Sequence, residues 1–194
     1  MKYLKTYTSP LGIIYMSSDG EYLTGLWFSK SRDEKKHHDE YQEKNLKIFS
    51  ETEKWLDLYF QGRNPDFTPK YKIEGTPFRL AVSKIICKIP YGKVVTYQDV
   101  ANELAKMKGI AKMSCQAVGG AVGWNPICII IPCHRVVGTN GSLTGYGGGI
   151  QNKVKLLELE GIDMSKYFVP KKGTKLILPR ATSCKETKQI LYSP

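Results

Sequence analysis

Apolar and polar positions alternate in three short runs near the start of the chain, residues 2–7, 12–17 and 22–28. The runs are rich in β-branched and aromatic residues, and the turn signals Ser9-Pro10 and Ser18-Asp19-Gly20 separate them. This pattern predicts an antiparallel meander. Residues 29–44 are almost entirely polar and predict a solvated loop or polar helix. The adjacent His37 and His38 also allow a metal site, but no further ligands follow at metal-site spacing.

After residue 49, apolar residues recur at helical spacing. A capping box of Ser50 and Glu53 precedes an apolar face formed by Trp55, Leu56, Tyr59 and Phe60, which predicts an amphipathic helix. Residues 63–75 carry two prolines and few helix signals, so we expect a linker there. The expected organisation is an N-terminal α/β domain over residues 1–75, a second domain over residues 76–165 and a basic C-terminal extension over residues 166–194.

Three residues in the second half of the chain are candidate N-caps and predict the starts of three helices. Thr76 precedes Pro77 and an apolar face that runs to residue 86, and Thr96 precedes a helix with Asp99 in its first turn. Ser114 precedes a short helix of small residues, 115–121. The last two helices, joined by a lysine-bearing turn, have the pattern of a helix-turn-helix, whose small residues would allow close approach to a backbone or a duplex.

The excess positive charge lies in the same half. The 194 residues carry a net charge of +11; residues 1–75 hold 12 Lys and Arg against 12 Asp and Glu, whereas residues 76–194 hold 17 against 6. This asymmetry suggests nucleic acid as a partner, although a lysine-rich proteome would produce the same composition. The longest apolar run, residues 127–133, is far shorter than the ~20 residues that span a bilayer. The first ten residues lack a signal peptide, so we expect a cytoplasmic protein with no membrane partner.

The stretch with the most chemical content is residues 125–138. An apolar run that predicts a buried strand leads into Cys133, His134 and Arg135, and Asn125 is a turn residue whose amide can tie neighbouring backbone groups together. A nearby base or cation favours the thiolate of a cysteine, and His134 and Arg135 offer both. Because neighbouring side chains of a strand point to opposite faces, His134 would reach Cys133 through a bend or a water. A core cysteine beside a structural histidine fits the same residues. The five cysteines, irregularly spaced and without CxxC, argue against disulfides or a cysteine zinc site.

Several segments, in this order, resemble the O6-alkylguanine-DNA alkyltransferases, formally methylated-DNA protein-cysteine S-methyltransferases. They are Asn125-Pro126, residues 131–136 (IPCHRV), residues 145–149 (GYGGG) and residues 156–161 (LLELEG), with Thr76-Pro77-Phe78 and residues 89–92 (IPYG) upstream. The resemblance covers about residues 76–165. It implies an α/β protein in which an N-terminal antiparallel sheet and helix precede a mainly helical, winged-helix-like active-site domain with a helix-turn-helix.

The resemblance implies direct, irreversible repair of DNA without a metal or other cofactor. Cys133 would accept the methyl or other alkyl group of O6-alkylguanine, with O4-alkylthymine as a second candidate, in a single self-inactivating turnover. His134 would activate the thiol through a bound water, and Glu160 would orient His134. Tyr97 would donate its hydroxyl to the departing guanine, and Asn125 belongs to the same catalytic set.

The resemblance also implies double-stranded DNA as the partner of a monomeric protein. The lesion lies inside a duplex, so the nucleotide would be flipped out from the minor groove, with Ala117 and Gly120 packed close. The loop of Tyr146, Gly147 and Gly148 would cover the base. Carbonyl groups of Cys133 and Val136 would read its amino group. The other residues expected at the DNA or the base are Thr96, Ser114, Gln116 and Arg135.

Three positions depart from the family pattern. Gln116 stands where many members have an arginine that fills the space of the flipped nucleotide, and glutamine lacks the charge and the stacking plane of arginine. Gly147 stands where some members have serine, and Cys128 stands where some have a proline that lines the pocket. These differences bear on nucleotide flipping and on the choice among alkyl groups.

Two other classes of function share parts of the pattern. A non-catalytic alkyl-lesion binder of the same fold would carry a different residue, usually tryptophan, at the position of Cys133. A Cys-His hydrolase would need an oxyanion hole and a carbonyl substrate, which nothing in the sequence specifies. Cys133 and Glu160 together favour the transferase. Residues 162–194, with seven Lys and Arg against two Asp and Glu, fit either a soluble extension or a tail that touches DNA.

Overall fold

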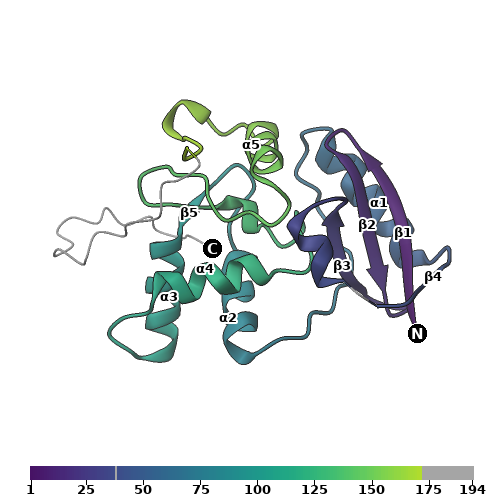
Figure 1. The fold of residues 1–194 in the computed structure, drawn as a ribbon, viewed down its shortest axis with the longest axis horizontal. Helices are drawn as coiled ribbons and strands as arrows, with labels where there is room; N and C mark the ends of the chain where they lie inside the picture. The colour runs from purple at the N-terminus through teal and green to yellow at the C-terminus, as the bar shows by residue number, and fades with distance from the viewer. Residues whose placement is uncertain (38, 172–194) are drawn as a thin grey trace.

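The N-terminal half is built on a four-stranded sheet in the computed structural model, which describes residues 1–37 and 39–171 (Figure 1). Strands β1 (Lys2–Ser9), β2 (Gly12–Ser18) and β3 (Leu23–Phe28) form the antiparallel meander, which confirms the expectation. A fourth strand, β4 (Tyr41–Glu43), pairs with β1 in parallel, so the strand order is β3-β2-β1-β4. The expectation of a purely antiparallel sheet was therefore wrong, because the polar segment returns along the free edge of β1.

The polar segment between β3 and β4 also contains the 3-10 helix η1 (Arg32–Lys36). Asp33 of this helix is buried, with 5% of its surface exposed, although the segment was expected to be solvated. His37, which had suggested a metal site, stacks on Trp27 with ring centroids 3.6 Å apart. Within the described residues, no three His, Cys, Asp or Glu side chains are grouped to hold a metal ion.

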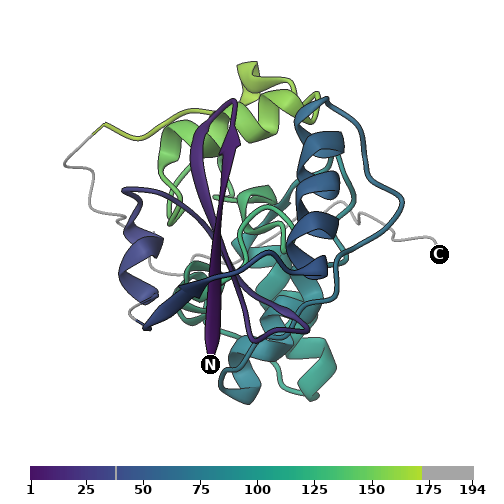
Figure 2. The same ribbon diagram turned by 90° about the vertical axis from the view of Figure 1, so that its right-hand side faces the viewer.

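Helix α1 (Lys47–Phe60) packs on one face of the sheet (Figures 1 and 2). Its buried side chains include the predicted apolar face, namely Trp55, Leu56 and Tyr59. The predicted capping box was wrong, because the helix begins one turn earlier, at Lys47, without a side-chain cap. Glu53 instead forms an ion pair with Lys5 of β1 at 2.9 Å.

The second half is mainly helical and lies at the other end of the molecule from the sheet (Figure 1). Helices α2 (Pro77–Ile86), α3 (Tyr97–Lys108) and α4 (Cys115–Trp124) pack against one another. All three predicted caps are confirmed. Thr76 accepts a hydrogen bond from the Arg79 amide, Ser114 accepts one from the Ala117 amide, and Thr96 forms a capping box with Asp99.

A two-stranded parallel sheet joins the segment that follows Cys133 to the start of α3. Strand β5 (Val95–Thr96) pairs with β6 (Val136–Val137), and the 3-10 helix η2 (Cys133–Arg135) directly precedes β6. Helix α5 (Ile150–Leu159) and the 3-10 helix η3 (Met164–Lys166) complete the described fold. The α/β class, with a sheet-and-helix part followed by a helix-turn-helix part, is as expected.

The predicted strand at residues 127–131 was wrong. This segment is a series of turns in which Ile129 has a φ of 66° and Ile127 forms only an isolated bridge to Leu26 of β3. The apolar run correctly predicted burial, since Ile127, Ile129 and Ile131 are at most 1% exposed. The Leu26 amide donates to the carbonyl of Pro126, just before this segment, at 2.9 Å, and the Leu26 carbonyl accepts from the Cys128 amide at 2.8 Å.

One hydrophobic core extends through both halves of the molecule. Phe28 of the sheet, Leu56 of α1, Val100 of α3 and Val122 of α4 all belong to it. The division at residue 75 and the separate extension from residue 166 therefore stay predictions, and residues 172–194 lie outside the described part. Of the residues described, none belongs to a helix long and apolar enough to cross a membrane.

Candidate active site

Asn125 holds the turn that presents Cys133. Its Nδ2 donates to the Ile131 carbonyl at 2.8 Å and lies 3.0 Å from Cys133 Sγ, and its Oδ1 accepts from the Ile127 amide at 3.0 Å. Asn125 is the C-cap residue of α4, and Cys133 is the first residue of η2. The amide therefore replaces strand pairing for this segment and places a hydrogen-bond donor on the sulfur atom.

Cys133 is a protonated thiol at neutral pH. Its residue is 8% exposed, and burial raises the pKa of the thiol to about 11. The hydrogen bond from Asn125 acts in the opposite direction, because it favours the charged form of the sulfur. Attack on carbon needs the thiolate, so the site requires a base that removes this proton.

His134 has the properties of that base. It is completely buried, and burial lowers its pKa from the usual 6.5, so the ring is neutral at pH 7. Nε2 lies 2.7 Å from Oε1 of Glu160. Because an ionised carboxylate only accepts, the neutral ring must carry its hydrogen on Nε2, which leaves the lone pair on Nδ1. Nδ1 is buried and has no hydrogen-bond partner among the described residues.

Glu160 is the centre of a buried hydrogen-bond network. Besides His134, its carboxylate accepts from the Tyr59 hydroxyl at 2.7 Å and from the Gly92 amide at 3.1 Å. Burial alone would raise the pKa of Glu160, but the hydrogen bonds from His134 and Arg135, together with the positive charge of Arg135, lower it to about 2. Glu160 therefore stays ionised and keeps the ring of His134 in one orientation.

Arg135 contacts protein rather than the outer surface, which differs from its expected place among the DNA-binding residues. Its Nε lies 2.8 Å from Oε2 of Glu160, Nη2 lies 3.0 Å from Oε1, and Nη1 donates to the Ile89 carbonyl at 2.7 Å. Its side chain is 10% exposed. Because the guanidinium is engaged from three sides, we assign it to holding Glu160 and not to a DNA base.

Two tyrosines border the site. The hydroxyl of Tyr97 in α3 donates to the Thr144 carbonyl at 3.2 Å, and burial raises its pKa to about 12, so it stays a proton donor. The ring of Tyr146 meets His134 edge to face, with centroids 6.4 Å apart. The Tyr146 hydroxyl is buried and has no hydrogen-bond partner among the described residues. Both tyrosines were expected here.

Lys153 and Tyr59 belong to the site and were missed in the sequence. Lys153 is fully buried in α5, and its Nζ donates to the carbonyls of Val136 and Thr144 at 2.6 and 3.2 Å. Burial lowers its pKa to about 8. A signal was present, because Lys153 lies at helical spacing from the buried Leu156 and Leu157, where a lysine is not expected. One acceptor position of the Val136 carbonyl is thus already occupied.

The expected DNA contacts on α4 lie apart from this buried cluster. Ser114, Gln116, Ala117 and Gly120 are all exposed. A Cβ atom added at Gly120 would meet nothing within 4 Å, so this face of the helix is open. Thr96, in contrast, is half-buried, and its hydroxyl is engaged with Asp99 at the start of α3.

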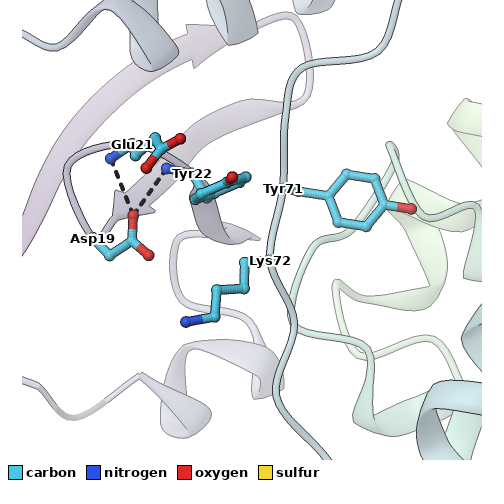
Figure 3. Close-up of a pocket in the computed structure, with 5 residues that line it drawn as sticks. All are labelled: Asp19, Glu21, Tyr22, Tyr71 and Lys72. Carbon is cyan, nitrogen blue, oxygen red and sulfur yellow. Dashed lines mark hydrogen bonds between the residues drawn. The ribbon is translucent and has the colours of Figure 1, made fainter.

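A separate surface pocket lies where the turn after β2 meets the linker, and Figure 3 shows its five lining residues. Its volume is about 610 Å³, and it is lined by Asp19, Glu21, Tyr22, Tyr71 and Lys72. Asp19 is bound to its own turn through the amides of Glu21 and Tyr22, at 3.1 and 2.9 Å. Tyr71 points away from the other four residues (Figure 3), and its hydroxyl lies 3.5 Å from Cys87. The pocket pairs no nucleophile with a base and is not the candidate site.

Comparisons with known proteins bear on the family of the chain. The model of the 6-O-methylguanine DNA methyltransferase DNA-binding domain matches residues 77–162, and that of its ribonuclease-like domain matches residues 2–72. Methylated-DNA–protein-cysteine methyltransferase of Haemophilus influenzae is 38% identical over 181 residues, which cover 92% of this chain and 94% of the relative. The inducible enzyme of Bacillus subtilis is 46% identical over 115 residues, which cover 59% of this chain and 62% of the relative.

Solved structures support the same relationship. The O6-methylguanine methyltransferase of Mycobacterium tuberculosis is 37% identical with a TM-score of 0.71, and the match covers 82% of this chain and 93% of that one. The M. tuberculosis protein in complex with DNA is 35% identical with a TM-score of 0.72, and the match covers 85% and 94%. The chain therefore belongs to the family of 6-O-methylguanine DNA methyltransferases.

Proposed function

We propose that this chain repairs DNA by moving the alkyl group of O6-alkylguanine onto Cys133 Sγ. The observation that carries the proposal is the neutral, buried His134, whose Nε2 is fixed on Glu160 while Nδ1 keeps a free lone pair. Cys133 is the adjacent residue and a protonated thiol. A neutral base and a protonated thiol are thus consecutive residues of η2, and both are shielded from most solvent.

The reaction begins with transfer of the thiol proton, through a bound water, to Nδ1 of His134. The thiolate attacks the alkyl carbon, the new S–C bond forms, and the bond between that carbon and O6 breaks. Its electron pair stays with guanine, which regains the O6 carbonyl and takes a proton at the ring. Tyr97 supplies this proton. Because His134 keeps the proton taken from the thiol, the total number of protons and the net charge are unchanged overall.

Glu160 stabilises the intermediate state. When His134 holds a proton, the imidazolium faces an ionised carboxylate at 2.7 Å. Arg135, Tyr59 and the Gly92 amide keep Glu160 ionised and in place, so the charge pair forms without rearrangement. Asn125 acts on the sulfur atom. Its Nδ2 lies 3.0 Å from Cys133 Sγ, and this hydrogen bond favours the thiolate.

Double-stranded DNA binds on the open face of α4, with Gln116, Ala117 and Gly120 toward the minor groove and Ser114 and Thr96 at the helix starts nearby. The damaged nucleotide leaves the duplex, and Tyr146, Gly147 and Gly148 cover its base. Carbonyls of Cys133 and Val136 accept from the guanine amino group, which O4-alkylthymine lacks, so guanine lesions are preferred. The protein acts as a monomer, with residues 1–75, 76–165 and 166–194 as its parts.

Stoichiometry tests the proposal. The full chain is incubated with excess methylated duplex DNA, and the intact mass and the methyl groups released from DNA are measured together. We expect a plateau at one methyl group per protein, because a thioether is inert at neutral pH, unlike the thioester of a hydrolase. Multiple turnovers would refute the transfer and restore the Cys-His hydrolase.

The adduct must also be localised. Trypsin leaves Cys115, Cys128 and Cys133 on one peptide, residues 113–135, so fragment ions are needed to assign the methyl group. The proposal requires it on Cys133. Methylation of Cys128 or Cys115 in place of Cys133 would contradict the assignment of the acceptor.

A further inference from the structure

A carboxylate from the N-terminal half is buried beside the loop expected to cover the base. Asp33 lies in η1, and 5% of its surface is exposed. A Cβ atom added at Gly147 would overlap the Asp33 carboxylate, so this carboxylate occupies the space that a side chain at residue 147 would need. The polar group beside the loop thus comes from a different part of the chain.

Asp33 is joined to the DNA-binding helix through Lys36. The two side chains form an ion pair one turn apart in η1. Lys36 Nζ also donates to the carbonyl of Gly123, near the end of α4, at 2.6 Å. The segment η1 therefore contacts both the loop of Gly147 and the helix with the open face, which are otherwise separate elements.

This ion pair is close enough to Cys133 for both charges to act on the thiol. The carboxylate of Asp33 raises the pKa of Cys133, and the ammonium group of Lys36 lowers it. The same two charges act on Cys128, and Asp33 also acts on Tyr146. The two charges oppose each other.

Other groups that face the thiol come from several elements. Lys153 of α5 favours the thiolate, and Asn125 at the end of α4 donates to the sulfur. The hydroxyl groups of Tyr97 in α3 and Tyr146 in the loop, and the thiol of Cys128, also lie within reach of its charge. The adjacent His134 is paired with Glu160, which Arg135 also neutralises. Asp33 adds a negative charge to this set of groups, and it does not belong to the proposed catalytic residues Cys133, His134 and Glu160.

We propose that Asp33 and Lys36 are positioning residues for alkyl transfer, which seat the Gly147 loop against the end of α4 and fix the charge that the Cys133 thiol meets. The role of the thiol as alkyl acceptor rests on the function proposed above. Asp33 opposes formation of the thiolate, and Lys36 offsets part of that effect. The N-terminal half thereby sets the reactivity of a cysteine in the other half.

The test uses the full chain with Asp33→Asn and Lys36→Gln. The matched control is Lys35→Gln, which removes the same charge from an exposed residue of the same helix. The rate of Cys133 alkylation by iodoacetamide is measured against pH, with fragment ions used to localise the adduct. We expect Asp33→Asn to move the midpoint to lower pH and Lys36→Gln to higher pH, each by about half a pH unit or more, with Lys35→Gln unchanged.

Opposite signs distinguish this role from a purely structural one. Both variants break the same ion pair, so a role in folding alone would move both profiles in the same direction. Shifts of the same sign, or no shift, would overturn the proposal. The double variant Asp33→Asn/Lys36→Gln should return toward the wild-type midpoint. Lys36→Arg keeps the positive charge and should therefore keep the wild-type midpoint. This comparison with Lys36→Gln remains available even if Asp33→Asn does not fold.

Methyl transfer from duplex DNA is measured in parallel to separate the two proposals. If the wild-type chain transfers methyl groups but the midpoints do not move, this inference fails and the function stands. If the midpoints move in opposite directions but the wild-type chain transfers nothing, the proposed function fails and the influence of the ion pair on the thiol stands.

Discussion

Arg135 and Glu160 form a two-point buried ion pair, with Nε 2.8 Å from Oε2 and Nη2 3.0 Å from Oε1. The same carboxylate also holds His134 at 2.7 Å. A buried carboxylate with an arginine partner stays ionised where an isolated one would take up a proton. The ion pair therefore connects the stability of the fold with the orientation of His134.

Replacement of Glu160 by glutamine should destabilise the protein strongly. The change leaves the Arg135 guanidinium buried without its charged partner, which typically costs ~3–5 kcal/mol. Urea unfolding, followed by circular dichroism, measures the free energy of unfolding. Glu158→Gln is the matched control, because Glu158 lies in the last turn of α5, which Glu160 caps, but is exposed. Equal losses in the two variants would contradict the assigned role of Glu160.

Acid should remove the contribution of Glu160 to stability. Its pKa is about 2 in the folded protein and 4.5 ordinarily, so the unfolded chain binds more protons between these values. The contribution is therefore complete above pH 4.5 and is lost as the pH falls toward about 2. Unfolding free energies measured across this range should fall more steeply for the wild-type protein than for Glu160→Gln. Parallel curves would show that another group is responsible.

The rate of alkyl transfer should depend on the neutral form of His134. Burial lowers the pKa of His134 below 6.5, so the single-turnover rate should hold at pH 7 and fall only at lower pH, as the ring takes up a proton. Rapid quenching of reactions with methylated duplex, from neutral to acidic pH, measures this profile. A midpoint above 6.5 would be inconsistent with a buried neutral base.

Cys133→Ser should abolish alkyl transfer and leave DNA binding nearly unchanged. The substitution removes the nucleophile but changes one atom in a residue that is 8% exposed. Methyl release from DNA and a fluorescence titration with duplex measure the two properties separately. Residual transfer by the serine variant would mean that another residue accepts the alkyl group.

Gln116→Arg should strengthen binding or speed repair in duplex DNA more than in single-stranded DNA. Only a duplex leaves a space when the nucleotide flips, and Gln116 is exposed on α4 where an arginine could enter it. The added cation should also steepen the salt dependence of binding by roughly one unit of charge at most. Equal gains on both substrates would argue against a role of residue 116 in flipping.

Helix starts were predictable because a cap depends on neighbours along the chain. Thr76, Thr96 and Ser114 each bond to an amide three residues ahead, and all three were identified from their local sequence. Ser50 and Glu53 have the same local form, yet they lie inside α1. Glu53 pairs with Lys5 of a distant strand, and local sequence carries no information about that contact.

The Cys-His motif was identified in the sequence, but the path of its backbone was not. An apolar run shows that residues 127–131 are buried without showing how their amides are satisfied. The side chain of Asn125 and the carbonyl of Leu26 accept from two of these amides, and carbonyls within the turn accept from two others. Asn125 was expected to tie the turn together, whereas the contribution of Leu26 required the packing of the N-terminal sheet.

The charged partners around the active site depended entirely on packing. Tyr59 reaches Glu160 across 101 residues of sequence, and Asp33 of η1 meets the loop of Gly147. The sequence shows which residues are charged and where they stand along the chain. Whether a buried charge is stabilised or opposed depends on the groups that the fold brings within a few ångströms of it. For this reason the sequence identified Cys133, His134 and Glu160 through one motif pattern, while the places of Arg135, Lys153 and Asp33 followed from the three-dimensional contacts alone.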